Sequence, residues 1–318
     1  MGLALSLESL GTPKVSKKVN TGVASMELVE AMMHLNDATD GLNTALRQCD
    51  NVVATITNMQ AIRASVEQFG ITDALFSLVD RESLAASLNV VIPDKLDKSS
   101  AKAIKASVEA NIGASLKNAA KALGDFITKL WTKFTNFVAW FFKTNNGVAT
   151  MIKNTMAVKD LNSIGDVGDK FVAPDYNELK NVMNDITTLS TPGADEGETG
   201  RESAPKIKFP ESMEGTPASL NWNGNNLQEF CNKTVGFLEK KANLIAQSKE
   251  ADKSMKDAKA KAKAAEGGNA DALKEAKDKF EKAKNEAAAV SEIIKALNKL
   301  GRVAVSMLRK CKDKQAAK

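Results

Sequence analysis

Apolar side chains recur every three or four residues over long stretches of the chain, which is the pattern of helices that bury one face. Between Val23 and Phe69 these positions form one continuous stripe, and Gly70 follows where a helix C-cap is expected. The stripe predicts a long helix over residues 23–69. Residues 71–88 continue the pattern, which indicates one or two shorter helices.

A second helical pattern covers residues 100–143, after a break at Pro93. The Asn-Asn-Gly triplet at Asn145–Gly147 has the residue types of a left-handed helix ending, so we expect the helix to stop there and a new one to follow. Residues 190–220 hold four of the seven prolines among many Gly, Ser, Thr and Glu residues. This composition predicts a flexible linker or a long exposed loop.

The C-terminal part of the chain reads as two long helices, over residues 226–265 and 270–310, around the turn Glu266–Asn269. Alanine dominates near the turn together with Lys, Asp and Glu, so we expect a thin, highly charged antiparallel hairpin. Aromatic residues make up only 5% of the chain, against 43% hydrophobic residues. We therefore predict an all-α, elongated multi-helix protein with a C-terminal antiparallel helical hairpin.

Charge is distributed unevenly along the chain. Residues 1–109 carry 10 Lys/Arg and 13 Asp/Glu, a net charge of −3, and the remainder carries a net +8, to give +5 in all. Such asymmetry suggests a nucleic-acid or other acidic partner, although solvated helix faces also produce it.

Seven aromatic residues gather between Phe126 and Phe142, in FITKLWTKFTNFVAWFF. Lys129, Lys133 and Asn136 lie away from the apolar stripe of this segment, which favours a core helix over a membrane-surface or partner-binding helix. No window offers the roughly 18 uninterrupted apolar residues of a membrane span. The candidate aromatic face comprises Phe126, Trp131, Phe134, Phe137, Trp140 and Phe141.

The residues offer little for catalysis or metal binding. Cys49, Cys231 and Cys311 lie far apart and form no CxxC pair, which argues against a disulfide scaffold or a zinc module. The single histidine, His34, reads as a surface or packing residue. Phosphate-binding loops and the hydrolase and metalloprotease motifs do not occur in the sequence. We expect no enzyme, no cofactor and no metal, and we see no export signal.

A pattern of a small residue, any residue and Glu stands at Ser107-Val108-Glu109, followed by Ala110, where the chain changes from acidic to basic. The same pattern occurs at residues 6–8, 25–27, 65–67 and 212–214. Its position, rather than its spelling, makes Glu109–Ala110 a candidate processing site.

Four segments together resemble the internal head proteins of giant tailed bacteriophages: LALSLESLG, TDALFSLVDRESLAASLNVVIP, ASVEANIGASLKNAAKAL and ITKLWTKFTNFVAWFF. The likeness covers roughly residues 1–145. It lies in the general character of these segments and their order along the chain, more than in a strict motif. It implies that a prohead protease removes an N-terminal propeptide after a small-x-Glu site, with Ser107 and Glu109 recognised and Ala110 as the new N-terminus. The mature part would stay in the capsid with DNA.

The resemblance and the charge pattern divide the chain into an acidic propeptide-like segment (1–109), an aromatic-rich helical region (110–189), a linker (190–220) and a basic hairpin (221–318). The expected location is the inside of the phage capsid, and the host cytoplasm before assembly. Expected partners are the prohead protease, other head proteins and DNA contacted without sequence preference. The candidate DNA contacts are Lys256, Lys259, Lys261, Lys263, Arg309, Lys310, Lys312 and Lys314. A membrane-active, pore-forming-like helical protein and a helical scaffold or adaptor are the alternatives.

Overall fold

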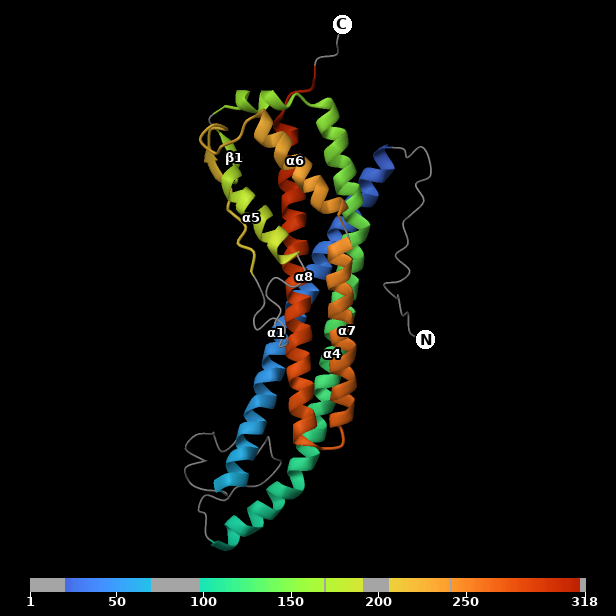
Figure 1. Cartoon of the computed structure of the whole chain (residues 1–318), viewed down its shortest axis with the longest axis vertical. Coiled ribbons are helices and arrows are strands. Elements are labelled where there is room, and N and C mark those ends of the chain that lie inside the picture. Colours follow the sequence, from blue (N-terminus) through green and yellow to red (C-terminus); the bar gives the residue numbers. More distant parts are fainter. Residues whose placement is uncertain (1–20, 70–97, 169, 191–205, 241, 315–318) are drawn as a thin grey trace. The chain divides into compact units, whose positions relative to one another are not determined.

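The computed structural model describes residues 21–69, 98–168, 170–190, 206–240 and 242–314 (Figure 1). In this part the chain is almost entirely helical, and the sheet has two three-residue strands, which confirms the predicted all-α class. The elements in chain order are α1 (Thr21–Phe69), α4 (Lys98–Val158), the 3₁₀ helix η2 (Leu161–Asp166), β1 (Phe171–Ala173), α5 (Tyr176–Leu189), β2 (Met213–Gly215), α6 (Gly224–Glu239), α7 (Ala242–Ala265) and α8 (Ala270–Lys310).

The chain forms two compact units, each assembled from separate stretches of sequence. Unit 1 comprises Met1–Gly41, Thr135–Glu250 and Glu286–Lys318, and unit 2 comprises Leu42–Phe134 and Ala251–Asn285. The long helices α1, α4, α7 and α8 each contribute residues to both units.

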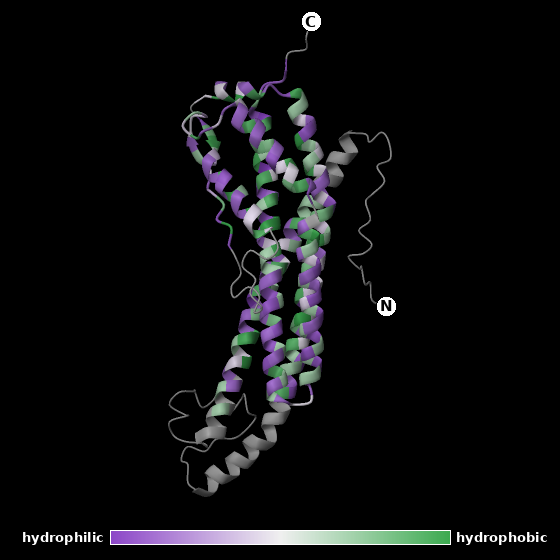
Figure 2. Cartoon of the chain, viewed as in Figure 1, coloured by the Kyte–Doolittle hydropathy of each residue, from purple (hydrophilic) through white to green (hydrophobic). Residues whose placement is uncertain are grey.

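Unit 2 is built from parts of four helices whose buried side chains recur in steps of three and four residues, the spacing of helices packed side by side. Alanine fills most of the buried positions that α7 contributes to this unit. Figure 2 shows hydrophobic residues interrupting the hydrophilic ribbon of α7 at regular intervals. The buried positions in this unit are Leu42, Ala45, Cys49, Ile56, Leu116, Ala120, Leu123, Ile127, Leu130, Phe134, Ala251, Met255, Ala258, Ala262, Ala265, Leu273, Ala276, Phe280 and Ala283.

The predicted hairpin is formed by α7 and α8, which lie side by side and are joined at residues 266–269 (Figure 1). Gly268 adopts a φ of 83°, a conformation that glycine reaches without strain. The Asn269 side chain then accepts hydrogen bonds from the backbone N–H groups of Asp271 (2.9 Å) and Ala272 (3.3 Å) and caps α8. Turn chemistry thus fixes where each arm ends.

The core of unit 1 contains an aromatic cluster around Trp222. The Trp222 ring lies 5.5 Å from Tyr176 and 5.4 Å from Phe230 between centroids, and its indole N–H donates to the carbonyl of Pro174 at 2.8 Å. Strands β1 and β2 pair antiparallel beside it, with Val172 opposite Glu214. This small ribbon anchors the chain between α5 and α6.

The expected helix ending at Asn145–Gly147 is wrong, because α4 continues through these residues to Val158. The Asn145 side chain is buried, and its amide donates to the carbonyl of Leu238 at 2.8 Å. Its oxygen accepts from the N–H of Asn146. Tertiary contacts therefore outweigh the local preference of these residues for a helix end.

The same contact accounts for a second difference, since the predicted single helix over 226–265 is two helices, α6 and α7. In a continuous helix the Leu238 carbonyl would accept from the N–H of residue 242, but it accepts from Asn145 instead. Lys240 leaves the helical conformation with φ −78° and ψ 78°. The helix therefore ends near Leu238, because the carbonyl of this residue accepts from Asn145 and not from the next turn of its own helix.

Two predicted segments fall partly or wholly outside the described residues. The short helices expected over residues 71–88 lie outside them, as do residues 191–205 of the expected linker. The rest of that stretch includes β2, and Leu220 at its end is buried.

Candidate functional site

The aromatic stretch of α4 supplies core residues to both units. Phe134 is fully buried in unit 2, and Phe137 and Phe141 are buried in unit 1, as the amphipathic pattern predicted. Phe126 and Trp131 in unit 2 are half-buried. These two rings are therefore the aromatic surfaces of unit 2 that a ligand could reach from α4.

Unit 2 brings Trp131 together with two of the predicted DNA-contacting lysines. The Trp131 indole N–H donates to a carboxylate oxygen of Asp252 at 2.6 Å, and the other oxygen pairs with Lys256 at 2.7 Å. The ammonium groups of Lys256 and Lys259 lie 5.5 and 5.9 Å from the centre of the indole ring. An aromatic ring flanked by two cations is a combination used to hold nucleic acid.

The solvent-facing half of α4 in unit 2 carries four exposed lysines, which we call the α4 cationic face: Lys117, Lys121, Lys129 and Lys133. Asp125 is the single carboxylate between Leu116 and Phe134. Among the described residues, none of the four ammonium groups lies within ion-pair distance of a carboxylate. Over 16 residues of helix the face extends about 24 Å.

These four lysines were not among the DNA contacts predicted from the sequence, although Lys129 and Lys133 were placed away from the apolar stripe. The available signal was the four-residue spacing of lysines along the polar side of an amphipathic helix. The larger number of lysines in the hairpin obscured it.

Lysines of the hairpin tip are more often paired. Lys261 bonds Glu275 across the hairpin at 2.7 Å, an interaction that raises the pKa of Lys261, and Lys279 lies 3.6 Å from Asp257. Lys263, the remaining predicted contact on α7, lies in the last turn of that helix. Water and salt screen exposed pairs of this kind, so phosphate groups can compete for these lysines.

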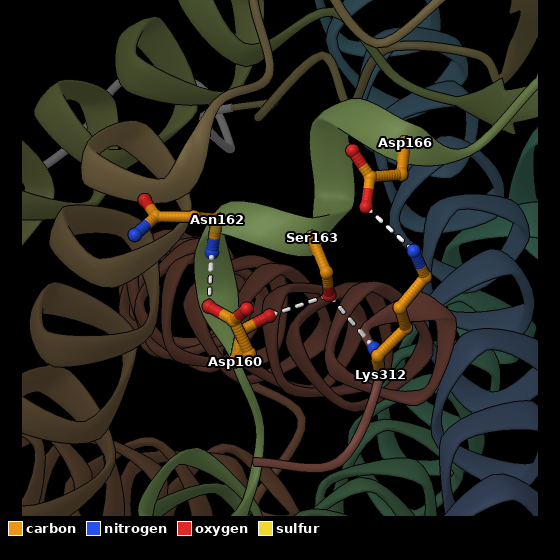
Figure 3. A network of polar contacts seen from close by, with 5 residues as sticks. All are labelled: Asp160, Asn162, Ser163, Asp166 and Lys312. Carbon is orange, nitrogen blue, oxygen red and sulfur yellow. Dashed lines mark hydrogen bonds and ion pairs between the residues drawn. The ribbon is translucent and has the colours of Figure 1, made fainter. Parts of the chain in front are cut away.

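The predicted contacts near the end of α8 belong to unit 1, where two of them serve the fold. Lys312 pairs with Asp166 at 2.6 Å, and its backbone N–H donates to the Ser163 hydroxyl at 2.7 Å (Figure 3). The ammonium of Lys314 donates to the carbonyl of Ala157 at 2.9 Å. Both side chains hold residues 312–314 against the end of α4 and η2.

The other two candidates in unit 1 lie in the last turn of α8. Lys310 lies 4.9 Å above the centre of the Phe171 ring, and Arg309 is exposed. Unlike the α4 cationic face, these residues form no extended row of lysines.

The candidate cleavage residues Ser107, Glu109 and Ala110 lie within the helical backbone of α4. Their side chains lie outside the described part of the structure. Processing at this bond remains a prediction.

The described ranges also bear on metal binding and on thiol chemistry. They contain no cluster of three or more His, Cys, Asp or Glu side chains that could hold a metal ion. Cys49 and Cys231 are buried, and burial raises the pKa of each thiol to about 12, which keeps both protonated and unreactive at neutral pH. None of the described helices combines the length and hydropathy needed to cross a lipid bilayer.

Comparison with known proteins gives no match: no family model fits the chain, and neither a curated protein nor a solved structure is significantly similar to it.

Proposed function

We propose that the chain is a non-enzymatic structural protein of a phage head, made as a precursor, cleaved during head maturation and packaged with DNA. Its resemblance to internal head proteins motivates the proposal, and the α4 cationic face is the observation that carries it. Contact with phosphates without sequence preference requires exposed cations and no base-reading module. The four lysines, with Lys256 and Lys259 beside Trp131, meet this requirement.

The decisive observation is the composition of purified particles. Mass spectrometry of virions should detect the protein and a peptide that begins at Ala110. Absence of the protein from particles would overturn the proposal, whereas an intact Glu109–Ala110 bond in virions would remove the processing step alone.

DNA binding is tested with a triple variant that reverses charge on the α4 cationic face, Lys117→Glu, Lys121→Glu and Lys133→Glu. The matched control carries the same change at three exposed lysines of unit 1, Lys206, Lys208 and Lys249. The first variant should bind a DNA duplex at least tenfold more weakly at low salt, and its salt dependence should be shallower by about one per lysine lost. Equal losses in both variants would mean that net charge, and not this face, governs binding.

The acidic segment stays associated after cleavage in this proposal, because α1 is part of both cores. Leu35 of unit 1 is 1% exposed, and Leu42 and Cys49 of unit 2 are fully buried. Asp50 of α1 also pairs with Lys284 at 2.7 Å. After cleavage in solution, the two fragments should co-elute on size exclusion and separate in urea; separation in native buffer would show that the segment is released.

The membrane-active alternative requires the aromatic stretch to leave the core. Phe134, Phe137 and Phe141 are at most 2% exposed, so insertion into lipid would first expose these rings to water. Dye release from liposomes by the folded chain would favour this alternative over the proposal.

A further inference from the structure

A groove of about 550 Å³ lies between α1 and α4 within unit 2. Its polar lining includes Gln48, Asn51 and Thr55 from α1, and Asn118 and Lys129 from α4, with the Phe126 ring beside them. Val52, Ile56 and Ala122 provide the apolar part of the lining. A volume in this range is typical of sites for small organic groups.

The polar groups of the groove suit a nucleobase. The carboxamides of Gln48, Asn51 and Asn118 each offer two N–H donors and a carbonyl acceptor, which can match the mixed donors and acceptors on the edge of a base. The lining contains no carboxylate, so nothing in it repels an anionic backbone. Phe126 supplies an aromatic surface of the kind on which bases stack.

The groove also adjoins the α4 cationic face, because Lys129 belongs to both. Its ammonium lies 5.1 Å above the centre of the Phe126 ring. A base in the groove would therefore place its own phosphate near Lys129, with Lys133 one helical turn further along α4.

We propose that this groove binds an unpaired base of single-stranded nucleic acid while the α4 cationic face holds the neighbouring phosphates. The inference rests on the proposed function and adds a preference for single-stranded nucleic acid over duplex. In a duplex, the edges of the bases are paired and their faces are stacked. A base must leave the stack before it can enter the groove, and a single strand avoids the cost of that step.

The test compares the binding of a fluorescein-labelled 20-mer of deoxythymidylate with that of a labelled 20-base-pair duplex by anisotropy, using the full chain. The wild-type chain should bind the single strand about tenfold more tightly than the duplex, since stacking one base on an aromatic ring contributes that much. Equal affinities for the two probes would overturn the inference.

Filling the groove tests its role directly. Ala122→Leu places a larger apolar group in the groove from an exposed position, and Ala54→Leu makes the same change at an exposed position of α1 that is not part of the lining. The first variant should lose the preference for the single strand and keep its duplex affinity, while the second should match wild type. An unchanged preference in Ala122→Leu would also overturn the inference.

A double variant, Asn51→Ala with Asn118→Ala, removes two carboxamides and adds no bulk. It should reduce the strand preference several-fold, and a preference equal to wild type would contradict a role for these amides. Failure of the inference is distinct from failure of the proposed function. The inference fails if the ratio of the two affinities does not depend on the groove, whereas the DNA-contact function fails if charge reversal on the α4 cationic face leaves duplex binding unchanged.

Discussion

The imidazole ring of His34 stacks on the indole of Trp140, with centroids 4.5 Å apart and planes inclined by 19°. The ammonium of Lys143 lies 4.2 Å from the centre of the same indole, and Glu30 lies 3.9 Å from the imidazole. The single histidine of the chain thus acts as a packing residue that joins α1 to α4 in unit 1.

Removal of this ring should weaken unit 1 modestly. His34→Ala should lower the free energy of unfolding by about 0.5–1.5 kcal/mol, the contribution of an aromatic pair. His34→Phe keeps a flat ring and should recover most of the loss. Urea denaturation followed by tryptophan fluorescence measures both variants, and equal stabilities for the two would contradict a role for stacking.

Two glycines of α6 should respond in opposite ways to alanine. A Cβ at Gly224 would collide with the side-chain oxygen of Asn162 and lie 3.1 Å from its Cα, whereas a Cβ at Gly236 meets nothing within 4 Å. We expect Gly224→Ala to destabilise by about 1–3 kcal/mol through overpacking. Gly236→Ala should stabilise by up to about 1 kcal/mol because alanine favours the helix. Thermal unfolding of the two variants measures both effects. Changes in melting temperature of the same sign would contradict the packing seen around Asn162.

The network in Figure 3 predicts that the Ser163 hydroxyl contributes more to stability than the ion pair between Lys312 and Asp166 does. Ser163 is 4% exposed, donates to the carbonyl of Asp160 at 2.6 Å and accepts from the Lys312 N–H at 2.7 Å. Ser163→Ala leaves that N–H without its acceptor and should cost about 1–3 kcal/mol.

Lys312→Met is the matched comparison, because it removes the exposed ion pair with Asp166 but keeps the backbone N–H. This variant should destabilise the fold less than Ser163→Ala does, because water screens the exposed ion pair. Amide hydrogen exchange at Lys312 should accelerate in Ser163→Ala and stay slow in Lys312→Met. A larger loss in Lys312→Met would reverse our ranking of the two contacts.

The buried thiols should make stability fall at alkaline pH. Burial raises the pKa of Cys49 from 9.0 to about 12, an effect that nearby Lys284 reduces in part. Between these two values the unfolded chain releases a proton that the native chain retains, so the contribution to stability is complete below pH 9 and is lost as the pH rises toward 12. The loss amounts to about 1.4 kcal/mol per pH unit for one thiol.

Comparison with Cys49→Val isolates the contribution of this thiol to the pH dependence of stability. Urea unfolding at pH 8, 9, 10 and 11 should show a flatter decline above pH 9 in the variant. Parallel declines for the variant and wild type would contradict the raised pKa of the Cys49 thiol.

Local chemistry made parts of the fold predictable. Residues 270–310 form α8 with the predicted bounds, since Gly268 and Asn269 specify the turn and the cap without help from distant residues. The continuation of α4 past Asn145 and the end of α6 were not predictable, because both depend on the bond between Asn145 and Leu238, which are 93 positions apart.

The candidate site shows the same division. The amphipathic pattern placed Phe134 and Phe137 in the core and Lys129 and Lys133 outside it, which is information carried by helical spacing alone. By contrast, Trp131 and Asp252, which form a hydrogen bond, are 121 positions apart in the sequence. Nothing in either local sequence indicates the other, and the groove beside Phe126 likewise depends on which face of α1 packs next to α4.

The discontinuous make-up of the two units has a consequence during translation. Unit 2 needs residues up to Asn285 and unit 1 needs residues beyond Glu286, so neither can close while α4 is leaving the ribosome. The rings of Phe134, Phe137 and Phe141, which are buried in the folded protein, therefore stay exposed to water until their packing partners are synthesised. At a translation rate of about 5–20 residues per second, this takes many seconds. The nascent chain should therefore be a client of ribosome-associated chaperones over the interval between synthesis of α4 and of α8.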